Sequence, residues 1–189
     1  MVTTRLVETG DAEVLARLVV DNREFLAPYE PLREEPWSTA AGQRAAVEAA
    51  LDEHARGTCL PHVVLDDDGA VIGRATLSGI VRGALQSASL GYWIAERAGG
   101  RGTATAAAAR LTSIAFGELG LHRVQAETLV DNVRSQRVLR RNGFTRYGLA
   151  PRYLRIAGEW RDHVMFQLLD PGADPAHAVR RSSDHHPAG

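Results

Sequence analysis

Apolar residues recur along this chain at two spacings, and the change from one spacing to the other predicts helices interleaved with strands. Four apolar residues from Val14 to Val19 recur at helical spacing, which predicts a helix that begins near Ala12 and ends before Pro28. The segment 22–37 is rich in proline and aromatic residues and is predicted to be an ordered irregular loop. Further helices are predicted at 38–57, 104–119 and 133–142, and strands at 5–7, 59–65, 71–77, 90–95, 123–130, 144–147, 153–156 and 163–169.

Length and composition are those of one globular domain. The chain has 189 residues, of which 44% are hydrophobic and 24% are charged. We predict a single domain over residues 1–170, because the sequence from Pro171 onward has almost no hydrophobic content and is expected to be a disordered tail. His177, His185 and His186 lie in that tail and are interpreted as solvated side chains, so no metal site is predicted.

Charge, hydropathy and cysteine content argue against several classes of protein. The formal net charge of −1 disfavours a surface built for nucleic acid, so no direct nucleic-acid partner is predicted. The chain has no run of about 18 apolar residues and no signal-peptide core, which predicts a cytoplasmic protein without a membrane segment. The single cysteine, Cys59, allows no internal disulfide and is expected to pack in the interior rather than act as a nucleophile.

The stretch Ser89–Thr105, SLGYWIAERAGGRGTAT, combines an apolar strand, a glycine-rich turn and the start of an alanine-rich helix. Gly99, Gly100 and Gly102 carry no Cβ that would keep a ligand away from the backbone. The first amides of the following helix lack intrahelical partners and lie at the positive end of the helix dipole. This turn therefore predicts an anion site, most naturally for a phosphate or a pyrophosphate.

Three kinds of phosphate-binding loop compete for this turn, beside the alternative of an ordinary turn without a ligand. A Walker A loop needs a Gly-Lys-Ser/Thr ending, which the turn lacks. A Rossmann fingerprint needs glycine where Thr105 stands. The turn resembles the acetyl-CoA loop of the GCN5-related N-acetyltransferases, Gln/Arg-x-x-Gly-x-Gly/Ala, at Gly102 and Ala104, but the first position of that pattern is Gly99.

A second block makes the resemblance to this acetyltransferase family specific. Residues 127–144, ETLVDNVRSQRVLRRNGF, resemble the fourth helix and following strand of the family, in the branch that acetylates the amino termini of ribosomal proteins. Segments 22–31, 78–83 and 158–163 resemble the same branch, and the resemblance spans about residues 3–170. It implies an α/β (α+β) fold with a mixed, mostly antiparallel central sheet that is splayed at the middle and has helices on both faces.

The resemblance also implies acetyl-CoA as the cofactor and a set of residues that hold it. The strand at 91–95 is expected to pair with the pantetheine arm, and the turn is expected to hold the pyrophosphate. Four arginines are candidates for the 3′-phosphate end of CoA or form a solvated face: Arg134, Arg137, Arg140 and Arg141. The expected cofactor-binding residues are Trp93, Ile94, Gly100, Arg101, Gly102, Thr103, Ala104, Thr105, Asn132 and Arg137.

Three residues are expected to act in catalysis. By resemblance, Asn132 hydrogen-bonds the CoA arm, Ser135 protonates the leaving thiolate, and a backbone N–H of the strand at Tyr92 stabilises the oxyanion. Structural interpretations stay open for two of them, because Asn132 is also a good helix N-cap and Ser135 falls in the first helical turn. The amine is expected to attack the thioester directly, without a covalent enzyme intermediate.

The general base and the acceptor site are less sharply defined. Glu127, Glu24 and His163 are candidate bases, and Ser89 stands where relatives often have glutamate. An α-amine with a pKa near 7.7–8.0 is about one-tenth neutral at pH 7, whereas a lysine is neutral at only about 0.04%, so a weak base suffices for an N-terminal substrate. The residues expected to contact the acceptor are Phe25, Tyr29, Arg82, Tyr153 and His163.

The favoured function is acetylation of a protein or peptide N-terminus, with a ribosomal protein as the favoured acceptor. Two alternatives remain open at this point. One is an acyltransferase for a small amine such as an antibiotic or a polyamine, and the other is a non-catalytic CoA-binding protein, which the departures at Gly99 and Ser89 would fit. A homodimer is also left open.

Overall fold

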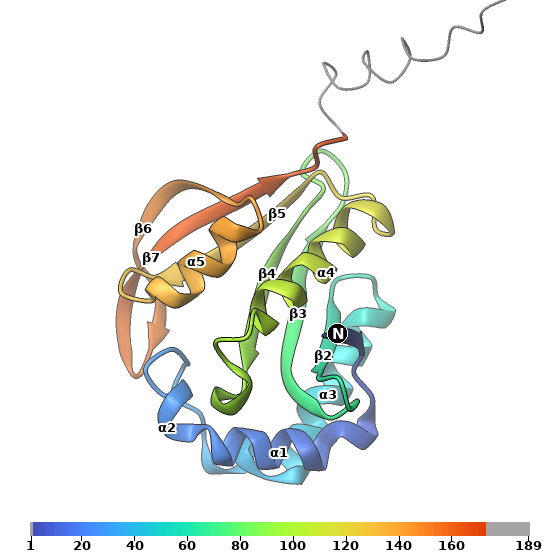
Figure 1. Cartoon of the computed structure of the whole chain (residues 1–189), viewed down its shortest axis with the longest axis vertical. Coiled ribbons are helices and arrows are strands. Elements are labelled where there is room, and N and C mark those ends of the chain that lie inside the picture. Colours follow the sequence, from blue (N-terminus) through green and yellow to red (C-terminus); the bar gives the residue numbers. More distant parts are fainter. Residues whose placement is uncertain (1, 173–189) are drawn as a thin grey trace, which may run out of the picture.

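The structure, a computed structural model, describes residues 2–172 of the chain, so all of the predicted tail except Pro171 and Gly172 lies outside the described residues. One seven-stranded sheet has the order β1-β2-β3-β4-β5-β7-β6 (Figure 1); only β4 and β5 are parallel neighbours. The strands are β1 (Thr3–Leu6), β2 (Leu60–Leu65), β3 (Val71–Val81), β4 (Ser87–Ile94), β5 (Arg123–Leu129), β6 (Thr145–Ile156) and β7 (Glu159–Leu169).

Helices cover both faces of this sheet, as the family resemblance implies. The α-helices are α1 (Ala12–Asp21), α2 (Arg23–Leu26), α3 (Ala40–Ala55), α4 (Thr103–Gly117) and α5 (Val133–Arg141). The short 3₁₀ helices are η1 (Thr9–Asp11), η2 (Glu35–Ser38) and η3 (Glu96–Ala98). Helices α4 and α5 lie in front of the sheet in Figure 1, whereas α1 and α3 pack together on the opposite face and contact β3 and β2.

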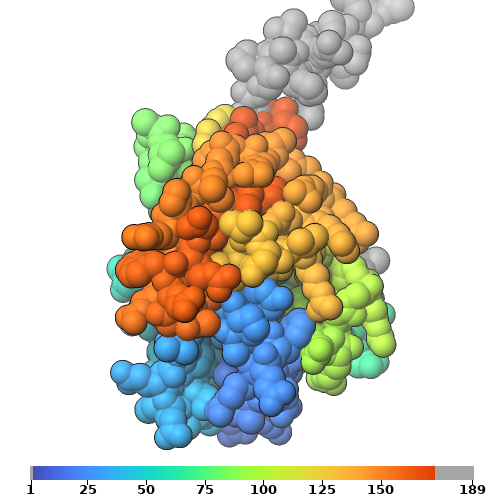
Figure 2. Space-filling view, turned by 90° about the vertical axis from the view of Figure 1, so that its left-hand side faces the viewer, coloured from blue at the N-terminus to red at the C-terminus, as the bar shows by residue number. Residues whose placement is uncertain are grey.

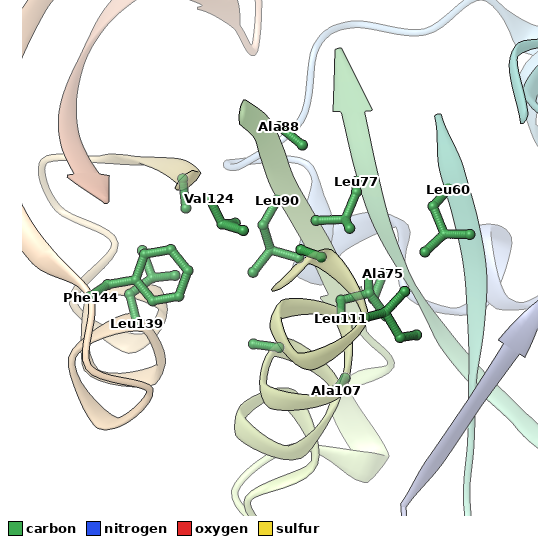
Figure 3. Close-up of a cluster of buried hydrophobic side chains, with 14 of the residues drawn as sticks. Leu60, Ala75, Leu77, Ala88, Leu90, Ala107, Leu111, Val124, Leu139 and Phe144 are labelled. Atoms are coloured by element: carbon green, nitrogen blue, oxygen red, sulfur yellow. The ribbon is translucent and has the colours of Figure 1, made fainter. Parts of the chain in front are cut away.

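Two hydrophobic clusters, one on each face, hold these layers together. Val63 and Val64 are adjacent in β2 and fully buried, and because successive strand residues point to opposite faces, they enter different clusters. Val63 packs with Leu15 and Val47 from α1 and α3. Val64 belongs to the larger cluster, in which Leu111 of α4 lies among strand residues (Figure 3). Burial of these apolar side chains is the main stabilising contribution to the fold.

The prediction of two separate strands at 144–147 and 153–156 is wrong, because β6 is one continuous edge strand. Gly148 and Pro151 suggested a break, but irregularities in the register with β7 absorb the residues around them. A proline is tolerated on an edge strand because its missing N–H leaves no unpaired partner there. Likewise, the predicted loop at 22–37 contains α2 and η2.

Candidate active site

The sheet opens between β4 and β5, and this opening forms the centre of the site. The two strands pair only where Ser87–Ser89 meets Arg123–Gln125. Farther along, β4 stays paired with β3 as far as Ile94, and β5 stays paired with β7 as far as Leu129. Within residues 2–172, no strand fills the gap between them, so the inner edge of β4 offers backbone hydrogen-bonding groups there. The predicted splay at the middle of the sheet is therefore present, and the two halves diverge in Figure 1.

A cavity of about 690 Å³ lies at this opening. Segments near residues 25, 93, 102 and 135, distant in sequence, form its wall. Their blue, lime-green and gold surfaces lie together in Figure 2. Of the residues predicted from sequence, the wall includes Phe25, Tyr29, Tyr92, Trp93, Ile94, Gly100, Gly102, Thr103, Ala104, Thr105, Asn132, Ser135 and Arg137.

The N-terminus of α4 forms one side of the cavity and carries unpaired backbone donors. Gly102 is the N-cap and has a φ of +81°, a left-handed conformation that favours glycine. The first intrahelical bond runs from the Ala106 N–H to the Gly102 carbonyl, so the amides of Thr103, Ala104 and Thr105 have no acceptor within the helix. Together with the helix dipole, these amides make the turn suited to an anion.

Side chains anchor this turn from two directions. The Thr103 hydroxyl donates to the Ala98 carbonyl at 3.0 Å, which closes the loop on itself. The Glu96 N–H donates to Oδ1 of the buried Asn22 at 2.7 Å, which ties the turn to the end of α1. One bond therefore fixes the turn internally, and the other fixes it to the layer that contains α1.

Helix α5 adds positive charge to the cavity wall. Arg134, Arg137 and Arg141 line the cavity, and their spacing of three and four residues places them along one side of the helix. Arg140 does not line it; its guanidinium lies 5.9 Å from the Phe166 ring centroid and donates to Gln136. Three of the four arginines considered from sequence therefore border the cavity.

The N-terminal end of α5 brings together Asn132, Ser135 and Tyr92. Asn132 is the N-cap of the helix, and its Oδ1 accepts a hydrogen bond from the Ser135 N–H at 3.0 Å. The hydroxyl oxygens of Tyr92 and Ser135 are 2.8 Å apart. Burial raises the pKa of Tyr92 to about 12, so its hydroxyl keeps its proton at neutral pH. The capping role of Asn132 occupies its oxygen only and leaves the two Nδ2 hydrogens available.

A second group of polar side chains lies on the other face of β5. Gln125 pairs with Ser89, so Glu127, two residues farther along, lies level with Gly91 across the opening. Its neighbours Ala126 and Thr128 are buried, and alternation directs the half-buried Glu127 to the opposite face. Burial is the main reason that the pKa of Glu127 is raised above the ordinary glutamate value.

Tyr153 lies within reach of the Glu127 charge, and His163 pairs with Leu129, two residues farther along β5. Their ring centroids are 5.6 Å apart in an edge-to-face arrangement. His163 is 3% exposed, and its Nδ1 lies 2.9 Å from the Arg161 carbonyl. Because a carbonyl only accepts, Nδ1 is the donor in this hydrogen bond. Burial, and then the neighbouring Glu127 charge, raises the pKa of Tyr153.

Several predicted residues lie outside the cavity wall, among them Tyr153, His163 and the candidate base Glu127. Arg82 donates to the Leu119 carbonyl, at the end of the sheet where β4 begins rather than where it opens. Arg101 is exposed in the turn but does not line the cavity. The candidate base Glu24 is likewise exposed on α2 and does not line the cavity, although its neighbour Phe25 does. Sequence reasoning missed Leu26, Glu96 and Val138, whose residue types carry no signal of a binding site.

The remaining features of the described residues concern nucleophiles, metals and membranes. Cys59 is buried, and burial raises its pKa to about 11, which disfavours a reactive thiolate. Between residues 2 and 172, no three His, Cys, Asp or Glu side chains gather in a way that could hold a metal ion. No helix in that range is long and apolar enough to cross a membrane.

Comparison with known proteins places this chain in a family. The family model for the acetyltransferase (GNAT) domain matches residues 2–145. The chain belongs to the GNAT acetyltransferase family. Among its relatives, the ribosomal protein uS5-alanine N-acetyltransferase of Escherichia coli K12 is 35% identical to this GNAT over 172 residues, which are 90% of this chain and 89% of that protein.

Solved structures agree with this placement. The ribosomal-protein-S5-alanine acetyltransferase of Vibrio fischeri superposes with a TM-score of 0.86 at 28% identity, covering 92% of this chain and 96% of that one. Mycobacterium smegmatis RimJ, in complex with CoA-disulfide, superposes with a TM-score of 0.87 at 31% identity, covering 96% of this chain and 89% of that one. This GNAT is therefore an acetyltransferase, and the predicted fold and family resemblance are confirmed.

Proposed function

We propose that this GNAT transfers an acetyl group from acetyl-CoA to the N-terminal α-amine of a protein, of the ribosomal-protein-alanine type, within a ternary complex. The observation that carries the proposal is one cavity at the opening of the sheet, where the α4 N-terminus, the unpaired edge of β4 and the Ser135 hydroxyl converge. The 35% identity to the uS5-alanine enzyme over 90% of this chain supports the acceptor class.

The residues of the cavity suit a CoA thioester. The free amides of Thr103–Thr105 fit a pyrophosphate, and Arg134, Arg137 and Arg141 supply positive charge for the third phosphate. The β4 edge at Trp93 and Ile94 hydrogen-bonds an extended, amide-bearing arm as a neighbouring strand would. When bound, acetyl-CoA supplies an acetyl group already activated as a thioester.

Residues on the two sides of the opening act on different parts of the reaction, the attacking amine and the leaving sulfur. Glu127, half-buried and with a raised pKa, accepts the proton that the attacking amine loses. A backbone N–H of β4 between Tyr92 and Ile94 stabilises the charge on the acetyl oxygen. Ser135, on the α5 side, donates a hydrogen bond to the departing sulfur. Since a serine hydroxyl is a weaker acid than a thiol, we assign it this hydrogen bond rather than complete proton transfer.

A bridge between two distant segments supports an acceptor site beside Tyr29. The Ala157 N–H, in the turn between β6 and β7, donates to the Glu30 carbonyl at 2.9 Å. A Cβ on Gly158 would lie 3.1 Å from Cδ1 of Leu32, so the two segments pack closely. In Figure 2 the blue segment near residue 30 lies against the orange hairpin. This bridge holds Phe25 and Tyr29 in place relative to Tyr153 and His163, and all four are proposed to contact the acceptor.

Thiol release from acetyl-CoA with a panel of peptides tests this function. One set carries free N-terminal Ala, Ser or Met, and a matched set has the same sequences with a blocked N-terminus and an added lysine. We expect turnover confined to the free N-termini, because their amines lose a proton far more easily than lysine does. Turnover on lysine peptides, or only on small amines such as spermidine, would contradict the proposal.

Two substitutions of Asn132 separate its capping role from its proposed contact with CoA. Asn132→Asp keeps an oxygen that caps α5 but removes the Nδ2 donor, and Asn132→Ala removes both. We expect Asp to raise the Kd for acetyl-CoA about fivefold without loss of stability, and Ala to cost about 1 kcal/mol of stability in addition. Titration calorimetry and thermal unfolding check both values. Full affinity in the Asp variant would leave Asn132 with a capping role alone.

A further inference from the structure

We propose that the Tyr92 side chain is a positioning residue, which donates its hydrogen to Ser135 Oγ so that the serine hydrogen is directed at the departing sulfur. The inference rests on the proposed function and adds to it, because the part of Tyr92 considered so far is its backbone. It assigns the leaving-group side of the reaction to a pair of hydroxyls rather than to one serine.

The pair depends on the opening of the sheet. Tyr92 lies on β4 beyond the last residue that pairs with β5, and its side chain reaches α5, 43 residues later in the chain. Both residues line the cavity, and their oxygens are 2.8 Å apart, the usual distance for a hydrogen bond between hydroxyls. Ser135 is itself held by its backbone bond to Asn132.

Each hydroxyl has one hydrogen, so the bond between the pair has either Ser135 or Tyr92 as its donor. In one arrangement, Ser135 donates to Tyr92 Oη and Tyr92 turns to the Ser135 carbonyl, at a long 3.4 Å. In the other, Tyr92 donates to Ser135 Oγ at 2.8 Å, and the serine hydrogen is free to point into the cavity. A thiolate in the cavity favours the second arrangement, because a charged acceptor forms the stronger hydrogen bond.

No proton needs to leave Tyr92 in this scheme. The amine nitrogen forms a bond to the acetyl carbon and loses a proton to the base, and the C–S bond breaks with its electron pair going to sulfur. Ser135 hydrogen-bonds that sulfur while Tyr92 hydrogen-bonds Ser135, and the released thiolate takes its proton from solvent. Burial keeps the Tyr92 hydroxyl protonated through the neutral range.

Tyr92→Phe removes the hydroxyl and keeps the ring, which packs against the core. In single-turnover reactions with the best acceptor peptide, we expect a rate about five to ten times lower and an unchanged Kd for acetyl-CoA. Ser135→Ala should lower the rate at least as much, and the double variant should be no slower than Ser135→Ala, because Tyr92 acts through the serine. Tyr147→Phe is the matched control, since that hydroxyl is also hydrogen-bonded, to Gln125 at 2.7 Å, but lies outside the cavity wall.

A change of leaving group distinguishes positioning from a general structural role. With the acetyl selenoester of CoA, whose selenol is a stronger acid than a thiol, the departing group needs less help. The ratio of the wild-type rate to the Tyr92→Phe rate should then fall toward one. The inference would be overturned if the rate ratio were the same for both leaving groups, or if the losses in the double variant were additive. Activity of the wild-type protein on free N-termini would in that case still support the proposed function. A wild-type protein inactive on every free N-terminus would overturn both.

Discussion

Glu127→Gln is expected to lower the turnover number by about 10²–10⁴-fold, the range for loss of a general base, with little change in the Kd for acetyl-CoA. Glutamine keeps the size of the side chain but cannot accept a proton. Glu127 lies level with Gly91 across the opening of the sheet, on the face that also carries Tyr153 and His163. Rapid-quench kinetics with a free N-terminal peptide measures the loss.

The other candidate bases provide the controls. Glu24→Gln changes a carboxylate that is exposed to solvent on α2 and should retain wild-type turnover. His163→Asn removes the ring that contacts Tyr153 and should reduce activity less than Glu127→Gln if the histidine only shapes the acceptor site. A larger loss in the histidine variant than in the glutamate variant would transfer the role of base to His163.

The pH dependence follows from the direction of the shift. Since burial raises the pKa of Glu127, the carboxylate becomes available as a base only at a higher pH than an ordinary glutamate, so the acid limb of the pH–rate profile should be displaced upward. That limb should vanish in Glu127→Gln.

A raised folded-state pKa of Glu127 also means that the stability contributed by its protonated form is lost as pH rises through that pKa. At neutral pH, the glutamine variant should therefore unfold at an equal or higher temperature than wild type, and a lower one would indicate structural damage.

Ala104→Glu is expected to weaken acetyl-CoA binding by about 100-fold, because a carboxylate would stand among the amides proposed to hold the pyrophosphate. Like charges in contact cost several kcal/mol, and about 3 kcal/mol corresponds to that change in Kd. The fold should not suffer, because glutamate is a good helix former and an acidic side chain in the first turn complements the helix dipole. We therefore expect affinity to fall while the unfolding temperature stays level or rises.

Ala106→Glu is the matched control for this variant. Ala106 is two residues farther along α4, exposed to solvent and outside the cavity wall. Its substitution adds the same charge to the same helix, so any loss of affinity from net charge alone would show in both variants. Equal Kd values for the two variants would contradict the assignment of the α4 N-terminus as the phosphate site.

The features that were predictable from sequence are local ones. The left-handed Gly102 at the start of α4 and the Asn132 cap of α5 are set by residues within one turn of each other, so turn and capping preferences suffice to find them. The same holds for most helices and strands, because the spacing of their apolar residues can be read within a short stretch of sequence. The continuous β6 was missed because proline and glycine break strands by local rules, and only its place at the sheet edge makes them tolerable.

Contacts between distant segments were decided by the tertiary structure. Because side chains alternate along a strand, Glu127 and Ala126 of β5 must face opposite ways. Only the burial of Ala126 in the larger hydrophobic cluster determines which face each side chain takes. Arg82 lies in segment 78–83, which resembles the branch that acetylates ribosomal proteins, yet the path of β3 and β4 carries it away from the opening. The Tyr92–Ser135 pair exists because β4 and β5 separate beyond Ser89, and the register of two strands is a property of their packing rather than of either sequence.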